Sequence, residues 1–303
     1  MNTLPAALLT ALLLTCSAAA ATFDITDYGA VGDGETLNTG PLQAAIDACG
    51  DAGGGTVRVP NGTWLFGTIF LRDNVRLYLA PGATLLGSTD RRHLNPRHLI
   101  VADGVRNVAI EGRGTLDAQG ENLWLTEPPE AFNPDEAYRW AEMWNYWRAY
   151  EVGRPIVIRD AEGVIIRDLT IRDSPEHTLV FEQSRDILVD NLRIRNPLWG
   201  LNTDGIQVLG CEDVRISNCD IITGDDAIVL KSETGRGGGR WVRNVTVTNC
   251  TIVTATNGFK CGTGSVGGFE RITFSNSTIT ADTSKMTLRT ISGISLMVVD
   301  GGT

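Results

Sequence analysis

The chain has 303 residues, of which 42% are hydrophobic, enough for one large domain or two average ones with a true core. Its formal net charge of −10 excludes nucleic acid as the main partner, because phosphate binding needs a basic surface. An acidic sugar substrate stays compatible, since a basic cleft can lie on an acidic protein. The 34 glycines among scattered Val, Ile and Thr indicate many short strands joined by tight turns.

The first residues are typical of an export signal. Residues 4–14 are an apolar stretch too short to span a bilayer, and small residues follow as far as Ala21. We expect residues 1–21 to be a signal peptide and the mature protein to be secreted or periplasmic. A lipoprotein signal ending at Cys16 is the alternative, which Thr15 fits poorly. No other segment of the sequence is a candidate membrane span.

A short helix is predicted near residues 39–49. Thr39 is the expected N-cap and Pro41 lies in the first turn. One apolar face is formed by Leu42, Ala45, Ile46 and Cys49. We expect this helix to cover the N-terminal end of the core, with strands starting after Gly53.

The dominant feature from about residue 100 is a repeat. From Gly163 onward its units begin 23, 27, 31 and 27 residues apart, at Asp186, Asp213, Asn244 and Arg271. Each unit alternates apolar and polar residues, as a strand with one buried face does, and an Asn- or Asp-containing turn follows. Such units must stack on copies of themselves, with strands ~4.8 Å apart. The sequence therefore predicts an all-β fold, a single-stranded right-handed parallel β-helix over residues 22–303.

The five cysteines after residue 21 form neither a disulfide framework nor a zinc site, because their number is odd and no CxxC spacing occurs. Cys219 and Cys250 occupy the same repeat position as Ser277. We expect these three residues to form an internal ladder of small side chains. No metal and no other cofactor is expected.

Two segments depart from the repeat. Residues 121–153 interrupt it and contain four of the seven tryptophans, Trp124, Trp140, Trp144 and Trp147. Packing of a long loop is favoured for them, with stacking on sugar rings as the alternative. Residues 291–300 are predicted as a strand with no capping element after it. Because an open β edge invites aggregation, a C-terminally truncated chain is favoured over a last coil capped by a partner.

Two acidic segments carry the predicted chemistry, Asn202-Thr-Asp-Gly and Gly224-Asp-Asp-Ala. Asp204 and Asp225 are 21 residues apart, about one coil, so we expect them on neighbouring rungs at the same angular position, with Asp226 beside them. Clustered carboxylates raise at least one pKa, and glycoside hydrolysis needs one protonated acid and one carboxylate. Turn formation by Asp-Gly and Gly-Asp, or a calcium site, are the alternatives.

These segments resemble glycoside hydrolase family 28, the polygalacturonases and rhamnogalacturonan hydrolases. Asn202-Thr-Asp-Gly-Ile and Thr223-Gly-Asp-Asp-Ala-Ile-Val-Leu-Lys-Ser match the two catalytic motifs of that family. The resemblance implies an inverting hydrolase of pectin-type acidic polysaccharide. It also implies Asp225 as the general acid, Asp204 and Asp226 as the bases that activate water, and Asn202 as a substrate-binding residue.

The sequence departs from the family pattern at two places. Asn257 stands where the family has the His of Gly-His-Gly and is the candidate substrate-binding residue at that position, and Lys260 is a new cation nearby. Arg289 is the one candidate for the Arg of the Arg-Ile-Lys motif, with Ile291 at the Lys position. Unsubstituted polygalacturonate is therefore not assured as the substrate.

Four cations or potential cations are candidates for binding a uronate carboxylate or a hydroxyl of the sugar. They are His177, Lys231, Lys260 and Arg289. His177 is predicted one coil before Asn202 and is otherwise a structural residue; the others are otherwise solvated surface charges.

Three functions compete on this evidence. The first is a hydrolase of pectin-like chains, acting as a monomer on an acidic plant polysaccharide. The second is a β-helix lyase or epimerase with a calcium site. The third is a non-catalytic glycan-binding β-helix, which has no reason to place three aspartates together.

Overall fold

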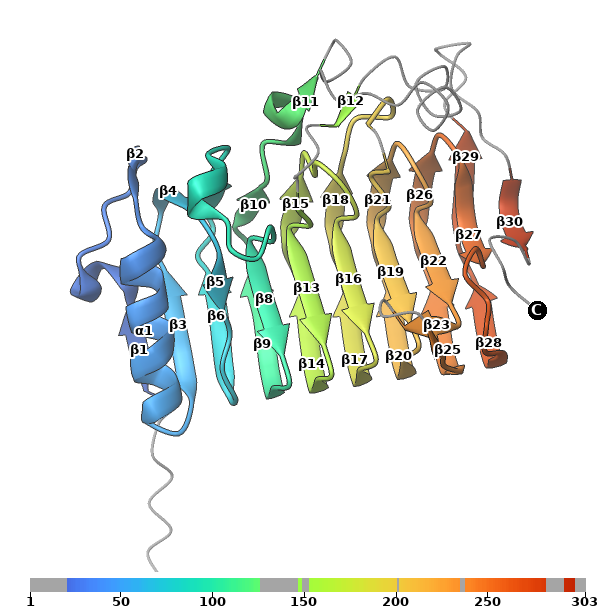
Figure 1. Ribbon diagram of the computed structural model, residues 1–303, viewed down its shortest axis with the longest axis horizontal. Helices are drawn as coiled ribbons and strands as arrows, with labels where there is room; N and C mark the ends of the chain where they lie inside the picture. The colour runs from blue at the N-terminus through green and yellow to red at the C-terminus, as the bar shows by residue number, and fades with distance from the viewer. Residues whose placement is uncertain are drawn as a thin grey trace, which may run out of the picture.

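The computed structural model describes residues 21–125, 147–148, 153–200, 202–234, 238–281 and 292–297. In these residues short strands stack, coil on coil, along the long axis of the molecule (Figure 1). A complete coil gives one strand to each of three parallel sheets and winds in the right-handed sense usual for such connections. The predicted right-handed parallel β-helix is confirmed.

We call the three sheets A, B and C. In the described residues sheet A contains β1 (Thr22–Asp24), β3 (Gly55–Val59), β6 (Val75–Leu79), β9 (Arg106–Gly112), β14 (Glu162–Arg167), β17 (Arg185–Asp190), β20 (Glu212–Ser217), β25 (Val242–Thr248) and β28 (Phe269–Ser275). Sheet B contains β2 (Asp33–Leu37), β4 (Gly62–Phe66), β7 (Ala83–Gly87), β10 (Thr115–Asp117), β15 (Thr170–Arg172), β18 (Arg193–Arg195), β21 (Asp220–Thr223), β26 (Thr251–Thr254) and β29 (Thr278–Ala281).

Sheet C carries the residues of interest. It contains β5 (Ile69–Phe70), β8 (Ile100–Asp103), β13 (Ile156–Arg159), β16 (Leu179–Glu182), β19 (Ile206–Leu209), β22 (Ile228–Lys231), β27 (Asn257–Cys261) and β30 (Ser292–Leu296). Two small antiparallel pairs lie outside the coils, β11 (Trp124–Leu125) with β12 (Trp147–Arg148) and β23 (Glu233–Thr234) with β24 (Gly238–Gly239). Short 3-10 helices span Ile25–Tyr28, Arg91–His93 and Gly120–Leu123.

The register of sheet A follows the predicted repeat. Val164, Ile187, Val214, Val245 and Ile272 are successive partners, spaced by 23, 27, 31 and 27 residues. The first four are fully buried, so the apolar positions of the alternating pattern line the interior of the coil. The predicted stacking is therefore confirmed at the level of single residues.

The turn between sheets A and B is left-handed in one coil after another. Asn191, Asn218 and Asn249 have φ values of 51°, 57° and 56°, a region that Asn tolerates. The side-chain amide of Asn191 donates to Asp168 at 2.7 Å, and that of Asn249 donates to Asn218 at 2.6 Å. The Asn- and Asp-containing turns therefore link neighbouring coils as well as reverse the chain.

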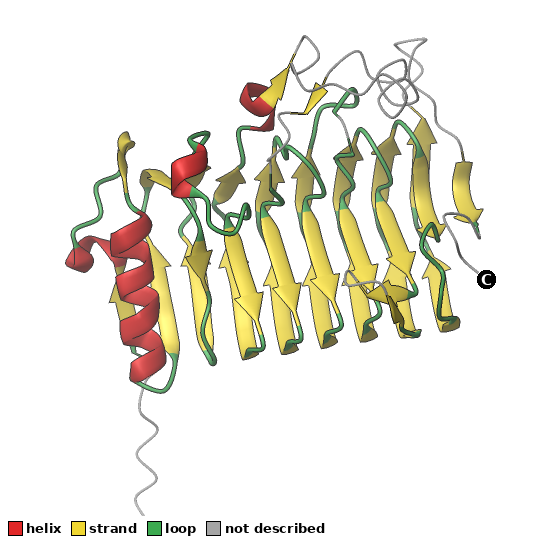
Figure 2. Ribbon diagram, viewed as in Figure 1, coloured by secondary structure: helices red, strands yellow, loops and turns green. Residues whose placement is uncertain are grey.

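Helix α1 (Thr39–Asp51) lies at the N-terminal end of the stack (Figure 2). Its predicted apolar face is confirmed, since Leu42, Ala45, Ile46 and Cys49 are all fully buried. The expected N-cap was wrong by one residue, because Asn38 holds that position. Asn38 bonds Val31 with its side chain, and the Thr39 hydroxyl accepts from the amide of Gly67 at 2.7 Å. Both side chains thus tie the helix to the coils instead of capping it.

The predicted ladder of small residues is confirmed. Cys219 and Cys250 are free and buried, their thiols donate to the carbonyls of Ser217 and Thr248, and the Cys250 amide donates to the Ser277 hydroxyl at 3.0 Å. The five cysteines within the described residues are all unpaired thiols.

The described part of the interrupting segment packs rather than projects. Trp124 is 7% exposed, meets Trp199 edge to face at 5.2 Å between ring centroids, and donates to the carbonyl of Pro175. Trp140, Trp144 and the first 20 residues lie outside the described residues. Among the helices that the structure describes, none has the length and apolar character needed to cross a membrane.

Candidate active site

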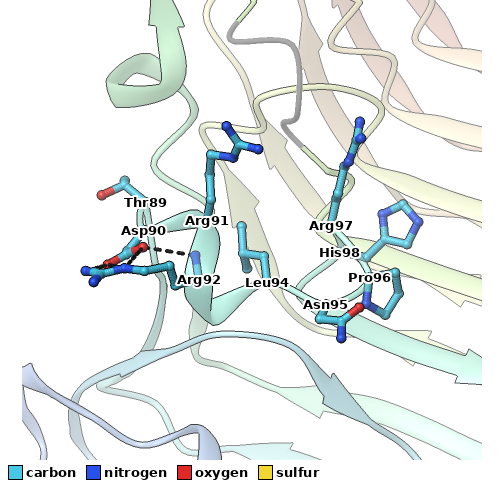
Figure 3. A pocket seen from close by; sticks show the side chains of 9 residues that line it. All are labelled: Thr89, Asp90, Arg91, Arg92, Leu94, Asn95, Pro96, Arg97 and His98. Atoms are coloured by element: carbon cyan, nitrogen blue, oxygen red, sulfur yellow. Dashed lines mark hydrogen bonds and ion pairs between the residues drawn. The ribbon is translucent and has the colours of Figure 1, made fainter.

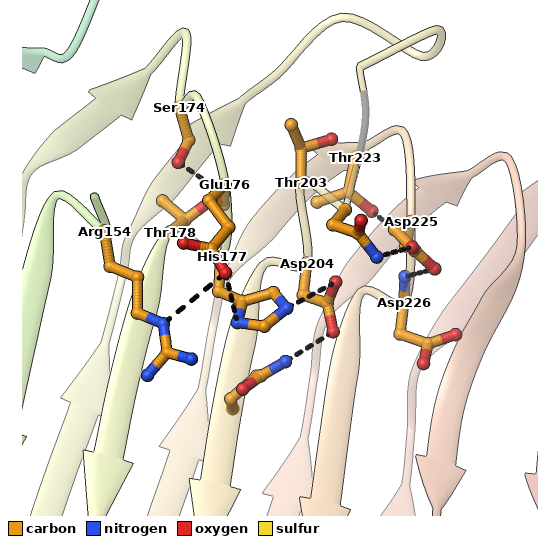
Figure 4. A network of polar contacts seen from close by, with 12 residues as sticks. Arg154, Ser174, Glu176, His177, Thr178, Thr203, Asp204, Thr223, Asp225 and Asp226 are labelled. Carbon is orange, nitrogen blue, oxygen red and sulfur yellow. Dashed lines mark hydrogen bonds and ion pairs between the residues drawn. The ribbon is translucent and has the colours of Figure 1, made fainter. Parts of the chain in front are cut away.

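Asp204 and Asp226 lie just ahead of strands β19 and β22, where the chain enters sheet C (Figure 4). The Gly205 amide donates to the carbonyl of Asp226 at 2.9 Å, and the two strands pair with a spacing of 22 residues. Asp226 is therefore the rung neighbour of Asp204, and the predicted pairing of Asp204 with Asp225 is wrong by one position. The coil is one residue longer than the motif spacing suggests, so Asp225 falls in the turn before the strand.

The same stacking aligns polar residues on five successive coils. Backbone hydrogen bonds run from the Thr178 amide to the Asp204 carbonyl at 2.8 Å and from the Ala227 amide to the Asn257 carbonyl at 2.9 Å. The strand registers therefore give five residues equivalent positions on successive coils: Arg154, His177, Asp204, Asp226 and Asn257. We call these five residues the site column.

His177 belongs to the site column beside Asp204, not beside Asn202 as predicted. Its Nε2 atom lies 3.7 Å from Asp204 Oδ1, within reach of an ion pair when the imidazole is protonated. Asn202 lies in the preceding turn, where its side-chain amide donates to Asp225 Oδ2 at 3.3 Å. Both predicted residues therefore contact the aspartate cluster, although each meets a different carboxyl group.

Burial dominates the electrostatics of Asp204 and Asp225. The pKa of Asp204 is well above its usual range because the side chain is buried and because Asp225 and Asp226 lie nearby. Gln207 Nε2 donates to Asp204 Oδ2 at 2.6 Å and opposes that rise. Burial and the charge of Asp226 raise the pKa of Asp225 to about 6, against a hydrogen bond from the Thr256 hydroxyl.

Asp226 has a different environment. Its Oδ2 atom accepts from Lys260 Nζ at 2.8 Å, and its Oδ1 atom accepts from Asn257 Nδ2 at 2.5 Å and from the Thr256 hydroxyl at 3.1 Å. Asp226 is 4% exposed and Lys260 is 8% exposed. Of the clustered carboxylates, Asp226 thus has a buried cation in direct contact. The sequence had indicated Lys260 as a cation near the site but not this partner.

A cleft of about 480 Å³ adjoins the cluster on sheet C. Buried Glu182 accepts from Arg154 Nη1 at 3.1 Å and from Arg159 Nε at 2.7 Å, which offsets both guanidinium charges. Lys231 also lines the cleft and makes no ion pair within the described part of the chain. Its charge lowers the pKa of Asp204, so the two residues interact across the cleft wall. Arg289 lies outside the described residues.

Comparison with known proteins decides the family. The family model described as glycosyl hydrolases family 28 matches residues 49–288. The chain belongs to glycoside hydrolase family 28. A probable polygalacturonase from Vitis vinifera is 31% identical over 241 residues, which cover 72% of this chain and 45% of that protein. An exo-poly-alpha-D-galacturonosidase from Dickeya chrysanthemi is 28% identical, over 73% of this chain and 44% of its own length.

This family 28 chain thus spans somewhat less than half the length of those two curated relatives. Solved structures share its fold. An exopolygalacturonase from Thermotoga maritima superimposes with a TM-score of 0.71 at 22% identity, covering 85% of this chain and 66% of that one. A polygalacturonase from Erwinia carotovora gives a TM-score of 0.68 at 19% identity, covering 93% and 81%.

The loop of residues 89–98 lines a second, open pocket of about 950 Å³ in this family 28 chain (Figure 3). Arg97 and His98 line both this pocket and the cleft. Burial and nearby Arg154 lower the pKa of His98 to about 4, which leaves its imidazole neutral at neutral pH. Arg91 and Arg97 extend to the same side of the loop. No sequence pattern pointed to these residues, because they lie in a loop outside the repeat.

Proposed function

We propose that this family 28 chain is an inverting glycoside hydrolase that cleaves pectin-type acidic polysaccharide. The observation that carries the proposal is the cluster of Asp204, Asp225 and Asp226 ahead of two adjacent strands of sheet C. Family membership supports it, as do the Vitis vinifera and Dickeya chrysanthemi relatives, which are named for action on galacturonan. The substrate class and the activity of the chain as it stands are part of the proposal.

Asp225 is the proposed general acid. Its pKa of about 6 lets it hold a proton at mildly acidic pH and transfer it to the leaving oxygen. Asp226, next to Lys260, is the carboxylate that we assign as the base that activates water. Asp204 is the second proposed base; its pKa is well above its usual range, and His177 Nε2 lies 3.7 Å from its Oδ1 atom, within ion-pair reach when the imidazole is protonated.

Recognition of a uronate carboxylate is assigned to the cleft. Lys231 and Arg97 line it. Charge-assisted hydrogen bonds from such cations suit a carboxylate on a sugar ring. Four cations and three glutamates line the cleft, so its lining is less acidic than the whole chain, whose net charge is −10.

The calcium-dependent lyase or epimerase is less well supported. Asp226 already accepts from Lys260, Asn257 and Thr256, and an ammonium group 2.8 Å from the carboxylate repels a second cation. A purely binding function does not account for the raised pKa values of buried Asp204 and half-buried Asp225, because desolvated carboxylates cost stability.

The direct test is incubation of the purified chain with a panel of pectic polymers, with and without chelator. We expect new reducing ends, no product absorbing in the ultraviolet, and equal rates in both arms. The first product should carry the inverted anomeric configuration by nuclear magnetic resonance. Activity lost to chelator and restored by calcium, with an ultraviolet-absorbing product, would establish the lyase instead.

Export belongs to the same proposal. The apolar residues 4–14 and the small residues up to Ala21 support removal of residues 1–21 and a secreted or periplasmic mature chain. The mass of the mature N-terminus checks the processing, because an intact Met1 or a lipid on Cys16 contradicts it.

A further inference from the structure

Lys260 lies on β27, which belongs to the coil after that of β22 and pairs with β22. Its Nζ atom reaches back across the sheet to Asp226 Oδ2 at 2.8 Å, and both side chains are almost fully buried, at 10% and 6% exposure. The contact joins residues 34 positions apart in the chain. A cation in this position has little surface left with which to meet a substrate.

The two oxygens of Asp226 are held from one side by a single coil. Lys260 and Asn257 belong to β27, and Thr256 directly precedes it. The same Thr256 hydroxyl lies 2.9 Å from Asp225 Oδ1, so it joins the two neighbouring carboxyl groups. This coil therefore fixes where the Asp226 oxygens point.

The charged and titratable groups around Asp226 come from four successive coils, the last of which carries Lys260. Asp225 is its chain neighbour, and the preceding coil brings Asp204, with His177 behind it at 3.7 Å. The charge of Lys231, the last residue of β22, lowers the pKa of Asp204. Asp226 forms an ion pair with Lys260, whereas Asp204 lies within ion-pair reach of His177 when the imidazole is protonated.

We propose that Lys260 is a positioning residue that holds the oxygens of Asp226 in place, so that Asp226 serves as the base and Asp225 as the acid. The inference rests on the proposed hydrolytic function. It withdraws Lys260 from uronate binding, where the sequence had placed it, and leaves that task to cations that face the cleft. The charge of Lys260 also lowers the pKa of Asp225 and keeps it from rising further under burial and the charge of Asp226.

The test compares Lys260→Met with Lys260→Arg, using a pectic polymer that the unaltered protein cleaves. For Lys260→Met we expect kcat to fall about 10²-fold with KM nearly unchanged, because Asp226 loses its orientation. The alkaline limb of the pH–rate profile should move to higher pH, since Asp225 loses a cation that lowers its pKa. Lys260→Arg should restore most of kcat and the original limb.

Two controls make the result specific. Arg243→Met removes a cation from β25, in the same coil but on sheet A, where Arg243 pairs with exposed Glu270, so kcat and both pH limbs should be unchanged. Adding Lys260→Met to Asp226→Asn should cause no further loss of kcat, because the carboxylate that Lys260 holds is already gone. This pair of variants decides the matter even if Lys260→Met alone does not fold.

A rise in KM with unchanged kcat and pH profile would overturn the inference and return Lys260 to substrate binding. So would a large further loss of kcat when Lys260→Met is added to Asp226→Asn. An unaltered protein that cleaves no pectic polymer refutes the proposed function. In contrast, an active protein whose Lys260→Met variant keeps its kcat and pH profile refutes the present inference alone.

Discussion

Asp225 has a raised pKa and lies in a turn. A substitution at Asp225 can therefore distinguish a catalytic role from a purely structural one. Asp225→Asn keeps the shape of the side chain and removes the acid. If Asp225 donates the proton, kcat should fall by about 10²-fold or more, measured as reducing ends at the pH optimum. If the residue only shapes the turn, Asn serves nearly as well, because it bonds its own backbone in the same way, and activity should stay close to normal.

The stability of the same variant provides the control. Because the folded-state pKa of Asp225 is raised from 3.8 to about 6, its protonated form stabilises the fold at low pH, and that contribution is lost as pH rises through about 6. Asn carries no charge at any pH. Asp225→Asn should therefore be more stable than the unaltered protein at pH 7, by about 1–3 kcal/mol, and nearly equal to it at pH 4. Urea melts at the two pH values measure the difference.

Single residues also show where sequence reasoning stops. The cluster of three aspartates follows from motif spacing, but the rung partner of Asp204 does not, because one extra residue in the turn moves the alignment from Asp225 to Asp226. The contact of Lys260 with Asp226 depends on a side chain crossing between strands 34 residues apart. Gln207 was missed for the same reason, since nothing in a repeating strand marks one polar residue as a ligand of Asp204.

At the scale of elements, strands β13 and β16 are linked by a buried ionic network. Glu182 accepts from Arg154 and Arg159, whose side chains are 22% and 23% exposed. Glu182→Gln leaves two guanidinium groups without their common carboxylate, and we expect the free energy of unfolding to fall by about 2–3 kcal/mol. Urea denaturation at pH 7 tests this value.

The matched control for that substitution is Glu270→Gln. Glu270 accepts from Arg243 at 3.0 Å between strands β28 and β25, but both side chains are more than one third exposed. Solvent screens that pair, so the loss should stay below about 1 kcal/mol. Equal decreases in the free energy of unfolding for the two variants would show that the burial of Glu182 does not strengthen its ion pairs.

Element boundaries were predictable where the physical signal is local. The alternation of apolar and polar residues places Val164, Ile187 and Val214 on one inward face, because only strand geometry puts every second side chain on the same side. The N-cap of α1 was displaced to Asn38 because the Thr39 hydroxyl bonds a neighbouring coil, a tertiary contact that no local pattern encodes.

For the whole molecule, the stacked arrangement explains why the fold could be predicted and the cleft could not. Each coil contacts mainly its neighbours, so a repeat period read from residues 163–276 is enough to define the architecture. The cleft depends instead on loops of unequal length, such as residues 89–98, whose conformation the period does not determine. The cations of the site are therefore found only once the coils and loops are assembled.

The site column has a consequence for how such an enzyme diversifies. Each of its five positions belongs to a separate coil, and the register of the strands that follow them aligns them. Asn257 and Lys260, both on β27, surround Asp226, whereas Asp204 belongs to the preceding coil and is placed by the pairing of β19 with β22. Evolution can thus change the side chain that one coil contributes to the site while the neighbouring coils keep their register.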